Sequence, residues 1–127
     1  MTDKGVILLV ENDSELNNLN RVTFYPRGYT VLTATTIAGA RSILRETEPD
    51  IILMESNLYD GDGLEFISEL TSVTKASIIF LTCRVDGKDE VRALNMGAWD
   101  YIKKPCDRFL LLTRVELAMR HRSWGSP

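Results

Sequence analysis

Several features are scarce or missing in this sequence of 127 residues, and each absence excludes a class of protein. No apolar stretch approaches the roughly 20 residues that a membrane-spanning helix needs. Residues 1–4 lead straight into an apolar run rather than a signal peptide. The two cysteines, Cys83 and Cys106, form neither a CxxC pair nor a disulfide framework. We therefore expect a cytoplasmic protein in which both cysteines are structural thiols.

Excess positive charge is missing as well. The chain has 15 Lys and Arg residues against 18 Asp and Glu residues, which gives a net charge of -3. Binding to nucleic acid or to an anionic membrane surface requires a basic excess, so we expect no direct contact with either. The nucleotide-binding patterns GxGxxG and GxxxxGK(S/T) are also absent. A flavin held without such a motif remains a distant alternative.

Five short apolar runs stand out in what the sequence does contain. They are continuous rather than alternating, which is typical of strands buried on both faces of a parallel sheet. The runs are Val6 to Val10, Thr30 to Leu32, Ile51 to Met54, Ile78 to Leu81, and Tyr101 with Ile102.

Segments with helical spacing separate these runs. Ile37, Ala40 and Leu44 share one helical face, and Thr36 before them is a suitable N-cap. A later helix with Val91 and Leu94 is expected to end at Gly97. Five alternations of strand and helix favour a doubly wound α/β sandwich with right-handed crossovers. We expect one domain over residues 1–122 and a linker or tail over residues 123–127.

Polar residues follow four of the runs, where the carboxyl ends of parallel strands meet at one edge of the sheet. Carboxylates, a hydroxyl and an ammonium would gather there, as phosphoryl transfer to a carboxylate requires. The alternative for each residue is ordinary loop polarity. The residues are Glu11, Asn12 and Asp13; Glu55, Ser56 and Asn57; Thr82 and Cys83; and Lys103, Lys104 and Pro105.

Four segments resemble the receiver domains of two-component response regulators. They read ILLVEND at residues 7–13, PDIILME at 49–55, FLT at 80–82 and GAWDYIKKP at 97–105. The resemblance covers residues 5 to 122 and implies a flavodoxin-like (βα)5 sandwich, with a five-stranded parallel sheet in the order 2-1-3-4-5. It also implies protein partners, namely a histidine kinase or an effector domain.

The resemblance assigns roles to individual residues. Glu55 stands where the family places its phosphoaccepting aspartate. Thr82 would be the hydroxyl that engages the phosphoryl group, Lys104 the ammonium, and Tyr101 the aromatic residue whose rotamer follows Thr82. The bond before Pro105 resembles the family's cis peptide. A homodimer through the fourth helix, fifth strand and fifth helix would use Arg92, Asp100, Lys103, Arg114 and Arg120, which otherwise form a solvated face.

Two positions depart from the family pattern. Glu11 is followed by neutral Asn12, where the family has two acids, so the magnesium ligand set of Glu11, Asn12, Glu55 and Asn57 is weakened. Glu55 is one methylene longer than aspartate, which moves the carboxylate by about 1.5 Å, and in-line attack tolerates such a displacement poorly. We expect no cofactor and, at most, weak Mg²⁺ binding.

Three interpretations of Glu55 remain open at this point. It could imitate the phosphorylated state through a salt bridge to Lys104, leave an inert pocket, or still accept a phosphoryl group with Mg²⁺. We expect a regulatory protein-interaction module that is not an enzyme and does not depend on phosphorylation. The alternatives are a conventional phosphoacceptor and a flavodoxin-like ligand binder.

Because Cys83 and Cys106 lie on strands expected to be neighbours, a redox response is a minor alternative. Residues 60–63 form only part of a calcium-loop pattern, so we interpret them as a turn-rich loop.

Overall fold

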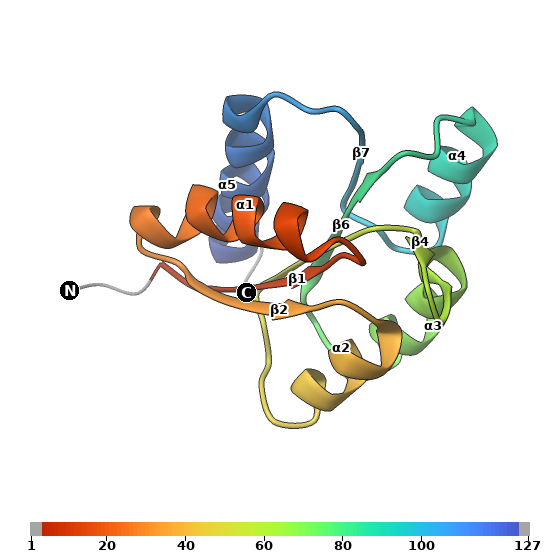
Figure 1. The fold of residues 1–127 in the computed structure, drawn as a ribbon, viewed down its shortest axis with the longest axis horizontal. Helices are drawn as coiled ribbons and strands as arrows, with labels where there is room; N and C mark the ends of the chain where they lie inside the picture. The colour runs from red at the N-terminus through yellow and green to blue at the C-terminus, as the bar shows by residue number, and fades with distance from the viewer. Residues whose placement is uncertain (1–3, 125–127) are drawn as a thin grey trace.

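A five-stranded parallel sheet forms the centre of the computed structural model, which describes residues 4–124. The strand order is β2-β1-β3-β6-β7 (Figure 1), and every neighbouring pair in this sheet is parallel. This is the predicted order 2-1-3-4-5, because the short strands β4 and β5 lie outside the sheet. The sheet strands are β1 (Val6–Val10), β2 (Thr30–Ala34), β3 (Ile51–Met54), β6 (Ser77–Thr82) and β7 (Asp100–Lys103).

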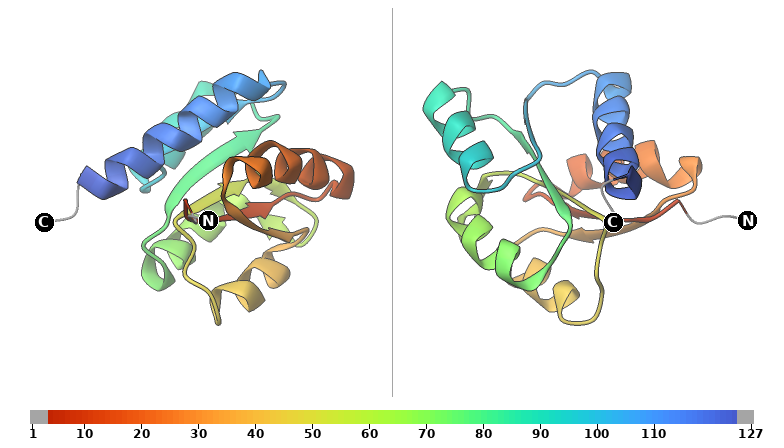
Figure 2. Two further views of the ribbon diagram at one scale, coloured as in Figure 1. Left: turned by 90° about the vertical axis from the view of Figure 1, so that its left-hand side faces the viewer. Right: turned by 180° about the vertical axis from the view of Figure 1, so that it is seen from behind.

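Helices cover both faces of the sheet. Figures 1 and 2 show α1 and α5 on one side and α2 and α3 on the other. Within β1, Ile7 and Leu9 join the core beneath α1 and α5, whereas Leu8 and Val10 join the core beneath α2, α3 and α4. Burial on both faces explains why the strands are continuous apolar runs. The helices are α1 (Ser14–Phe24), the short 3-10 helix η1 (Tyr25–Arg27), α2 (Ile37–Leu44), α3 (Gly63–Val73), α4 (Gly87–Asn95) and α5 (Arg108–Trp124).

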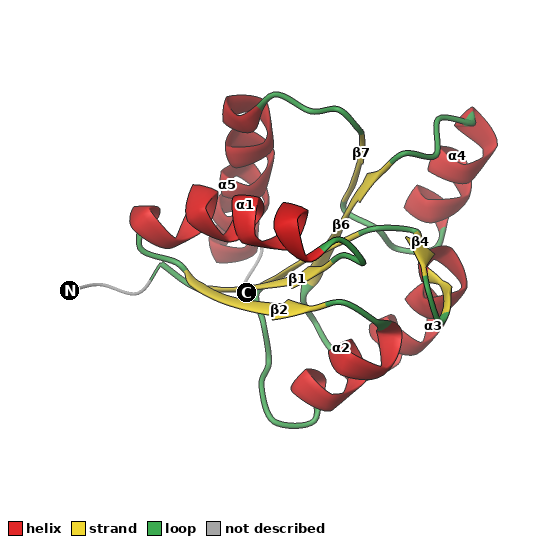
Figure 3. Cartoon of the chain, viewed as in Figure 1, coloured by secondary structure: helices red, strands yellow, loops and turns green. Residues whose placement is uncertain are grey.

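The segment expected to be a turn-rich loop contains a small antiparallel hairpin of β4 (Asn57–Leu58) and β5 (Gly61–Asp62), coloured as strands in Figure 3. The hairpin is attached to α2, because the Asp60 carboxylate accepts the N–H groups of Ile37 and Ala38 at 2.8 and 3.0 Å. These contacts use backbone donors that the first turn of a helix leaves free. The hairpin is thus held in place beside the carboxyl edge of the sheet.

Predicted helix boundaries agree well with the structure. The Thr36 hydroxyl caps α2 by accepting the N–H of Gly39. Gly97 follows α4 with a φ of 115°, a left-handed conformation that favours glycine. Helix α5 continues to Trp124, two residues into the predicted tail, and residues 125–127 lie outside the described part. Between residues 4 and 124, none of the helices combines the length and apolarity needed to cross a bilayer.

Candidate functional site

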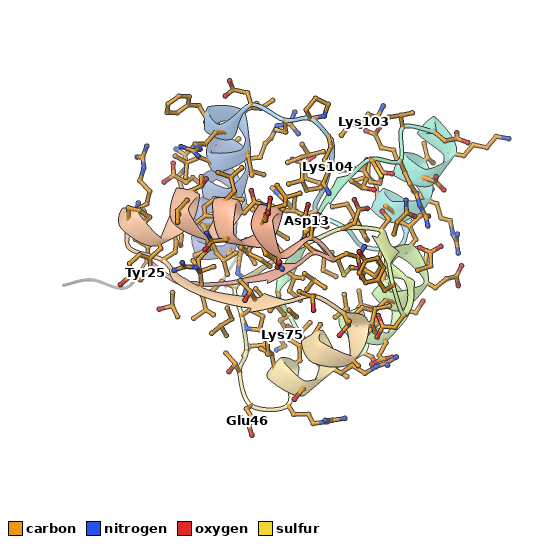
Figure 4. The ribbon with its side chains drawn as sticks, viewed as in Figure 1. Asp13, Tyr25, Glu46, Lys75, Lys103 and Lys104 are labelled. Carbon is orange, nitrogen blue, oxygen red and sulfur yellow. The ribbon has the colours of Figure 1, made fainter. Side chains whose placement is uncertain are left out.

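The carboxyl edge of the sheet brings the predicted site residues together. Glu11 follows β1, Glu55 follows β3, Thr82 ends β6 and Lys104 follows β7. Lys104 and the N-cap residue Asp13, both labelled in Figure 4, are far apart in the sequence but contact the same carboxylate, that of Glu11. The site is therefore built from the ends of four strands, as the parallel sheet requires.

The Glu55 carboxylate lies at the centre of the site and is only 4% exposed. One of its oxygens accepts hydrogen bonds from the Thr82 hydroxyl at 2.6 Å and from the backbone N–H of Asn57 at 3.0 Å. The other oxygen lies 2.9 Å from the Lys104 ammonium and accepts the backbone N–H of Cys83 at 3.4 Å. The predicted salt bridge between Glu55 and Lys104 is present.

Lys104 contacts a second carboxylate as well. Its ammonium also donates to Glu11, whose other oxygen accepts the N–H of Asp13 at 3.1 Å. The Lys104–Pro105 peptide bond is cis, as predicted. One ammonium therefore contacts two carboxylates.

The surroundings shift the pKa values of the central pair in opposite directions. Burial raises the pKa of Glu55, but the hydrogen bonds from Thr82, Asn57 and Lys104 together hold it below its ordinary value. Burial lowers the pKa of Lys104, but the bonds to Glu11 and Glu55 raise it above its ordinary value. The pair is therefore ionised throughout the neutral range.

These shifts predict how stability depends on pH. The pKa of Glu55 is depressed by folding, so its stabilising contribution is complete above the unfolded value of about 4.3 and is lost as the pH falls through the folded value. The pKa of Lys104 is raised, so its contribution is present below about 10.4 and is lost as the pH rises through the folded value. We expect Glu55→Gln to reduce the acid-side fall in unfolding free energy, measured by urea denaturation at several pH values. An unchanged acid-side slope would contradict this account.

Asn12 is oriented by its neighbours, and its orientation bears on metal binding. Its side-chain oxygen accepts the N–H of Tyr59 at 2.8 Å, so its amide nitrogen faces and donates to the backbone carbonyl of Asn57. A hydrogen-bond donor thus contacts the backbone carbonyl of Asn57, which is one residue of the predicted magnesium ligand set. Lys104 occupies an oxygen of both Glu11 and Glu55.

Magnesium requires several oxygen ligands in near-octahedral geometry. Within the described residues, no cluster of three or more His, Cys, Asp or Glu side chains is arranged to hold a metal ion. The oxygens of the predicted set already accept hydrogen bonds from Asn12 and Lys104. A bound Mg²⁺ would therefore have to share these oxygens with the Asn12 amide and the Lys104 ammonium or displace them.

The switch residues of the resemblance are both buried. Thr82 is fully buried, and Tyr101 is 5% exposed. The Tyr101 hydroxyl donates to the backbone carbonyl of Arg84 at 3.1 Å, and the Arg84 N–H donates to the Thr82 hydroxyl oxygen at 3.1 Å. Tyr101 therefore points inward and is connected to Thr82 through the backbone of Arg84.

Arg84 itself was not predicted from the sequence. Its guanidinium donates to the Asn57 side-chain oxygen at 2.7 Å and lies 3.1 Å from an Asp62 oxygen. The only sequence signal was its position two residues after Thr82, at the edge where polar side chains were expected to gather. Nothing in a single loop arginine indicates its partners.

The remaining predicted residues lie at the rim or on the surface. Cys83 is exposed beside Asn57, and Cys106 is partly buried, with its thiol pKa raised by that burial. On the predicted dimer face, most charged residues pair within the chain, and Arg120 is exposed there. The pairs are Arg92 with Glu65, Lys103 with Glu90, and Arg114 with Asp100.

Comparison with known sequences identifies the family. The sequence model described as "Response regulator receiver domain" matches residues 7–116. The chain belongs to the response-regulator receiver family. This receiver is 32% identical over 118 residues to the transcriptional regulatory protein KdpE of Mycobacterium tuberculosis, covering 93% of this chain and 52% of that protein. It is also 32% identical to the KDP operon transcriptional regulatory protein KdpE of Escherichia coli, and the match covers 92% of this chain and 52% of that protein. The receiver spans about half the length of the curated relatives it matches.

Solved structures show the same fold. A two-component response regulator from Clostridium difficile matches with a TM-score of 0.89 and 25% identity, covering 92% of this chain and 97% of that one. The non-phosphorylated HemR receiver domain of Leptospira biflexa has a TM-score of 0.84 and 27% identity, with 90% and 93% covered. The BeF3-activated RstA receiver domain of Klebsiella pneumoniae matches with a TM-score of 0.85 and 27% identity, covering 91% of this chain and 98% of that one. Because the last two scores are nearly equal, the backbone fold alone does not distinguish the two states.

Proposed function

We propose that this receiver signals without phosphorylation, with the Glu55 carboxylate taking the place of the phosphoryl group. The contacts of that carboxylate support the proposal. It is bound by the Thr82 hydroxyl and the Lys104 ammonium, which the family resemblance assigns to the phosphoryl group. The inward position of Tyr101 supports the same conclusion, because its rotamer is expected to follow Thr82.

The same arrangement disfavours phosphorylation of Glu55. Both of its oxygens accept hydrogen bonds, and the side chain is almost fully buried. Its extra methylene displaces the nucleophile by about 1.5 Å, and a misplacement of about 1 Å can lower a reaction rate by about 10²-fold. Asn12 adds a donor where a metal ligand would be needed. We therefore propose a pseudo-receiver without its own phosphoryl-transfer chemistry.

The output of such a domain is a protein contact. The curated relatives described above are named as transcriptional regulators, and this chain covers only about half of each. We propose that residues 1–122 form the regulatory module and that its signal passes to an effector domain or a second copy through α4, β7 and α5. Tyr101 lies on β7, so its position bears directly on that face. If the protein contacts nucleic acid, we propose that a segment other than this domain makes the contact.

The experiment that tests this function compares Glu55→Ala and Glu55→Gln with the unmodified receiver. Fluorotyrosine NMR would report on Tyr101, with its resonance assigned through Tyr101→Phe. Hydrogen bonds to charged groups contribute about 1.5–3 kcal/mol each, enough for a tenfold or larger change in a two-state population. We expect Glu55→Ala to move Tyr101 toward an exposed position and Glu55→Gln to do so in part.

The matched control is Glu69→Gln, which removes an exposed carboxylate that pairs with Arg41 and, among the described residues, contacts neither Glu55 nor Tyr101. It should leave the Tyr101 resonance unchanged. If Tyr101 stays buried in the Glu55→Ala variant, Glu55 does not act as the trigger and the proposed function is overturned.

A further inference from the structure

Arg84 connects two loops that flank Glu55. It lies in the loop between β6 and α4, and its side chain reaches the β4–β5 hairpin. Its Nε donates to the Asn57 side-chain oxygen at 2.7 Å, and its Nη2 lies 3.1 Å from an Asp62 oxygen. The Arg84 side chain is 23% exposed and that of Asp62 is 32% exposed. A two-point contact of this kind uses the fixed fork of the guanidinium and is better ordered than an ordinary surface ion pair.

The backbone of Arg84 reaches the switch residues at the same time. Its N–H donates to the Thr82 hydroxyl, and its carbonyl accepts the hydroxyl of Tyr101, both at 3.1 Å. The Arg84 carbonyl is thus an acceptor for the Tyr101 hydroxyl, which also interacts with the Ser56 side chain. Losing such a hydrogen bond in a partly buried position is unfavourable. Fixing Arg84 therefore favours the inward position of Tyr101.

The two anchors of the guanidinium are themselves fixed. Asn57 donates its N–H to Glu55, and its carbonyl accepts the amide of Asn12. Asp62 caps α3 with one oxygen, which accepts the N–H of Leu64 at 2.9 Å, and this leaves its other oxygen for Arg84. The hairpin is thus the rigid partner, and the loop carrying Arg84 is the part that the contact restrains.

We propose that Arg84 is a positioning residue that straps the β6–α4 loop to the β4–β5 hairpin and thereby holds Tyr101 buried. The strap is a second restraint beside the contacts of Glu55, and it uses different atoms. The inference rests on the proposed function only in taking the buried Tyr101 as the signalling conformation. It predicts that neutralising Arg84 loosens the loop even while Glu55 is intact.

The test compares Arg84→Gln with Arg41→Gln in the full chain. Arg41 is a matched control, because it makes a two-point contact with Glu69 between α2 and α3, off the α4, β7 and α5 face, and contacts neither Tyr101 nor Thr82 among the described residues. The readouts are the fluorotyrosine resonance of Tyr101 and the amide hydrogen exchange of residues 83–86. We expect Arg84→Gln to speed exchange in that loop by about tenfold and to move the Tyr101 resonance toward an exposed position. Arg41→Gln should change neither.

Two further variants separate charge from geometry. Asp62→Asn keeps a side-chain oxygen to cap α3 but removes the ionic partner of Arg84, so it should loosen the loop partially. Arg84→Lys keeps the charge but lacks the fork, so it should restore only part of the protection. If Arg84→Gln folds normally and leaves both readouts unchanged, the strap is overturned.

The Glu55 variants distinguish the strap from the proposed function. Release of Tyr101 by Glu55→Ala but not by Arg84→Gln would support the proposed function and overturn the strap. Release by Arg84→Gln but not by Glu55→Ala would support the strap and overturn Glu55 as the trigger. Release by each variant separately would support both.

Discussion

The double variant Asn12→Asp, Glu55→Asp is expected to gain one phosphoryl group on incubation with Mg²⁺ and acetyl phosphate, whereas the unmodified receiver is not. Asp at position 12 removes the amide that donates to the Asn57 carbonyl and adds a carboxylate to the metal ligand set. Asp at position 55 withdraws the carboxylate by about 1.5 Å from Thr82 and Lys104. Both changes return the pocket to the family pattern. Intact-mass spectrometry over time measures the result.

The single variants show which departure matters more. Restoring only position 55 corrects the nucleophile, and restoring only position 12 corrects the metal ligands. We expect each single variant to react more slowly than the double variant, with position 55 accounting for about 10²-fold because it controls alignment. A double variant that binds Mg²⁺ in an NMR titration but never gains mass would show that something other than these two residues blocks the reaction.

Replacement of Lys104 by Met is expected to lower the unfolding free energy by about 3 kcal/mol. Removing one member of a buried ion pair typically costs about 3–5 kcal/mol, because the remaining charge stays buried without compensation. Here two carboxylates lose their common partner, and the Glu55 and Glu11 side chains are only 4% and 11% exposed. Partial access of Lys104 to water, at 22% exposure, places the expected value at the lower end. Urea denaturation at neutral pH measures it.

Lys103 provides the matched control for this variant. It is the preceding residue, but its ion pair with Glu90 lies at the surface, with side-chain exposures of 46% and 36%. Lys103→Met should cost at most about 1 kcal/mol. Adding Glu55→Gln to Lys104→Met should recover part of the lost stability by removing one uncompensated charge. Equal losses from Lys103→Met and Lys104→Met would show that the pair with Glu55 is not buried in the way described.

The sheet and the central pair could be predicted from the sequence because their patterns are local. A strand such as residues 51–54 must be continuously apolar when both of its faces are covered, and the residues that follow it then share one edge with those that follow its neighbours. The salt bridge between Glu55 and Lys104 rested in addition on the resemblance to receiver domains, which assigns Lys104 as the ammonium of the site, and on the longer reach of glutamate. These features needed no knowledge of how distant loops pack.

The loop contacts could not be predicted in this way. Asp60 caps a helix that begins 23 residues earlier, and Arg84 contacts a residue 27 positions before it. Such pairs depend on the packing of whole elements, and a single polar residue in a loop carries no periodic signal. The direction of the Asn12 amide was also hidden, because it is set by the N–H of Tyr59 across the site.

The most direct test of phosphorylation-independent signalling uses the unmodified receiver. It is incubated with Mg²⁺ and acetyl phosphate, and separately with a cognate histidine kinase and ATP, and its intact mass is followed. We predict no stable gain of a phosphoryl group in either reaction, with Tyr101 buried before and after incubation. A stable gain located on Glu55, accompanied by inward movement of a previously exposed Tyr101, would contradict the account.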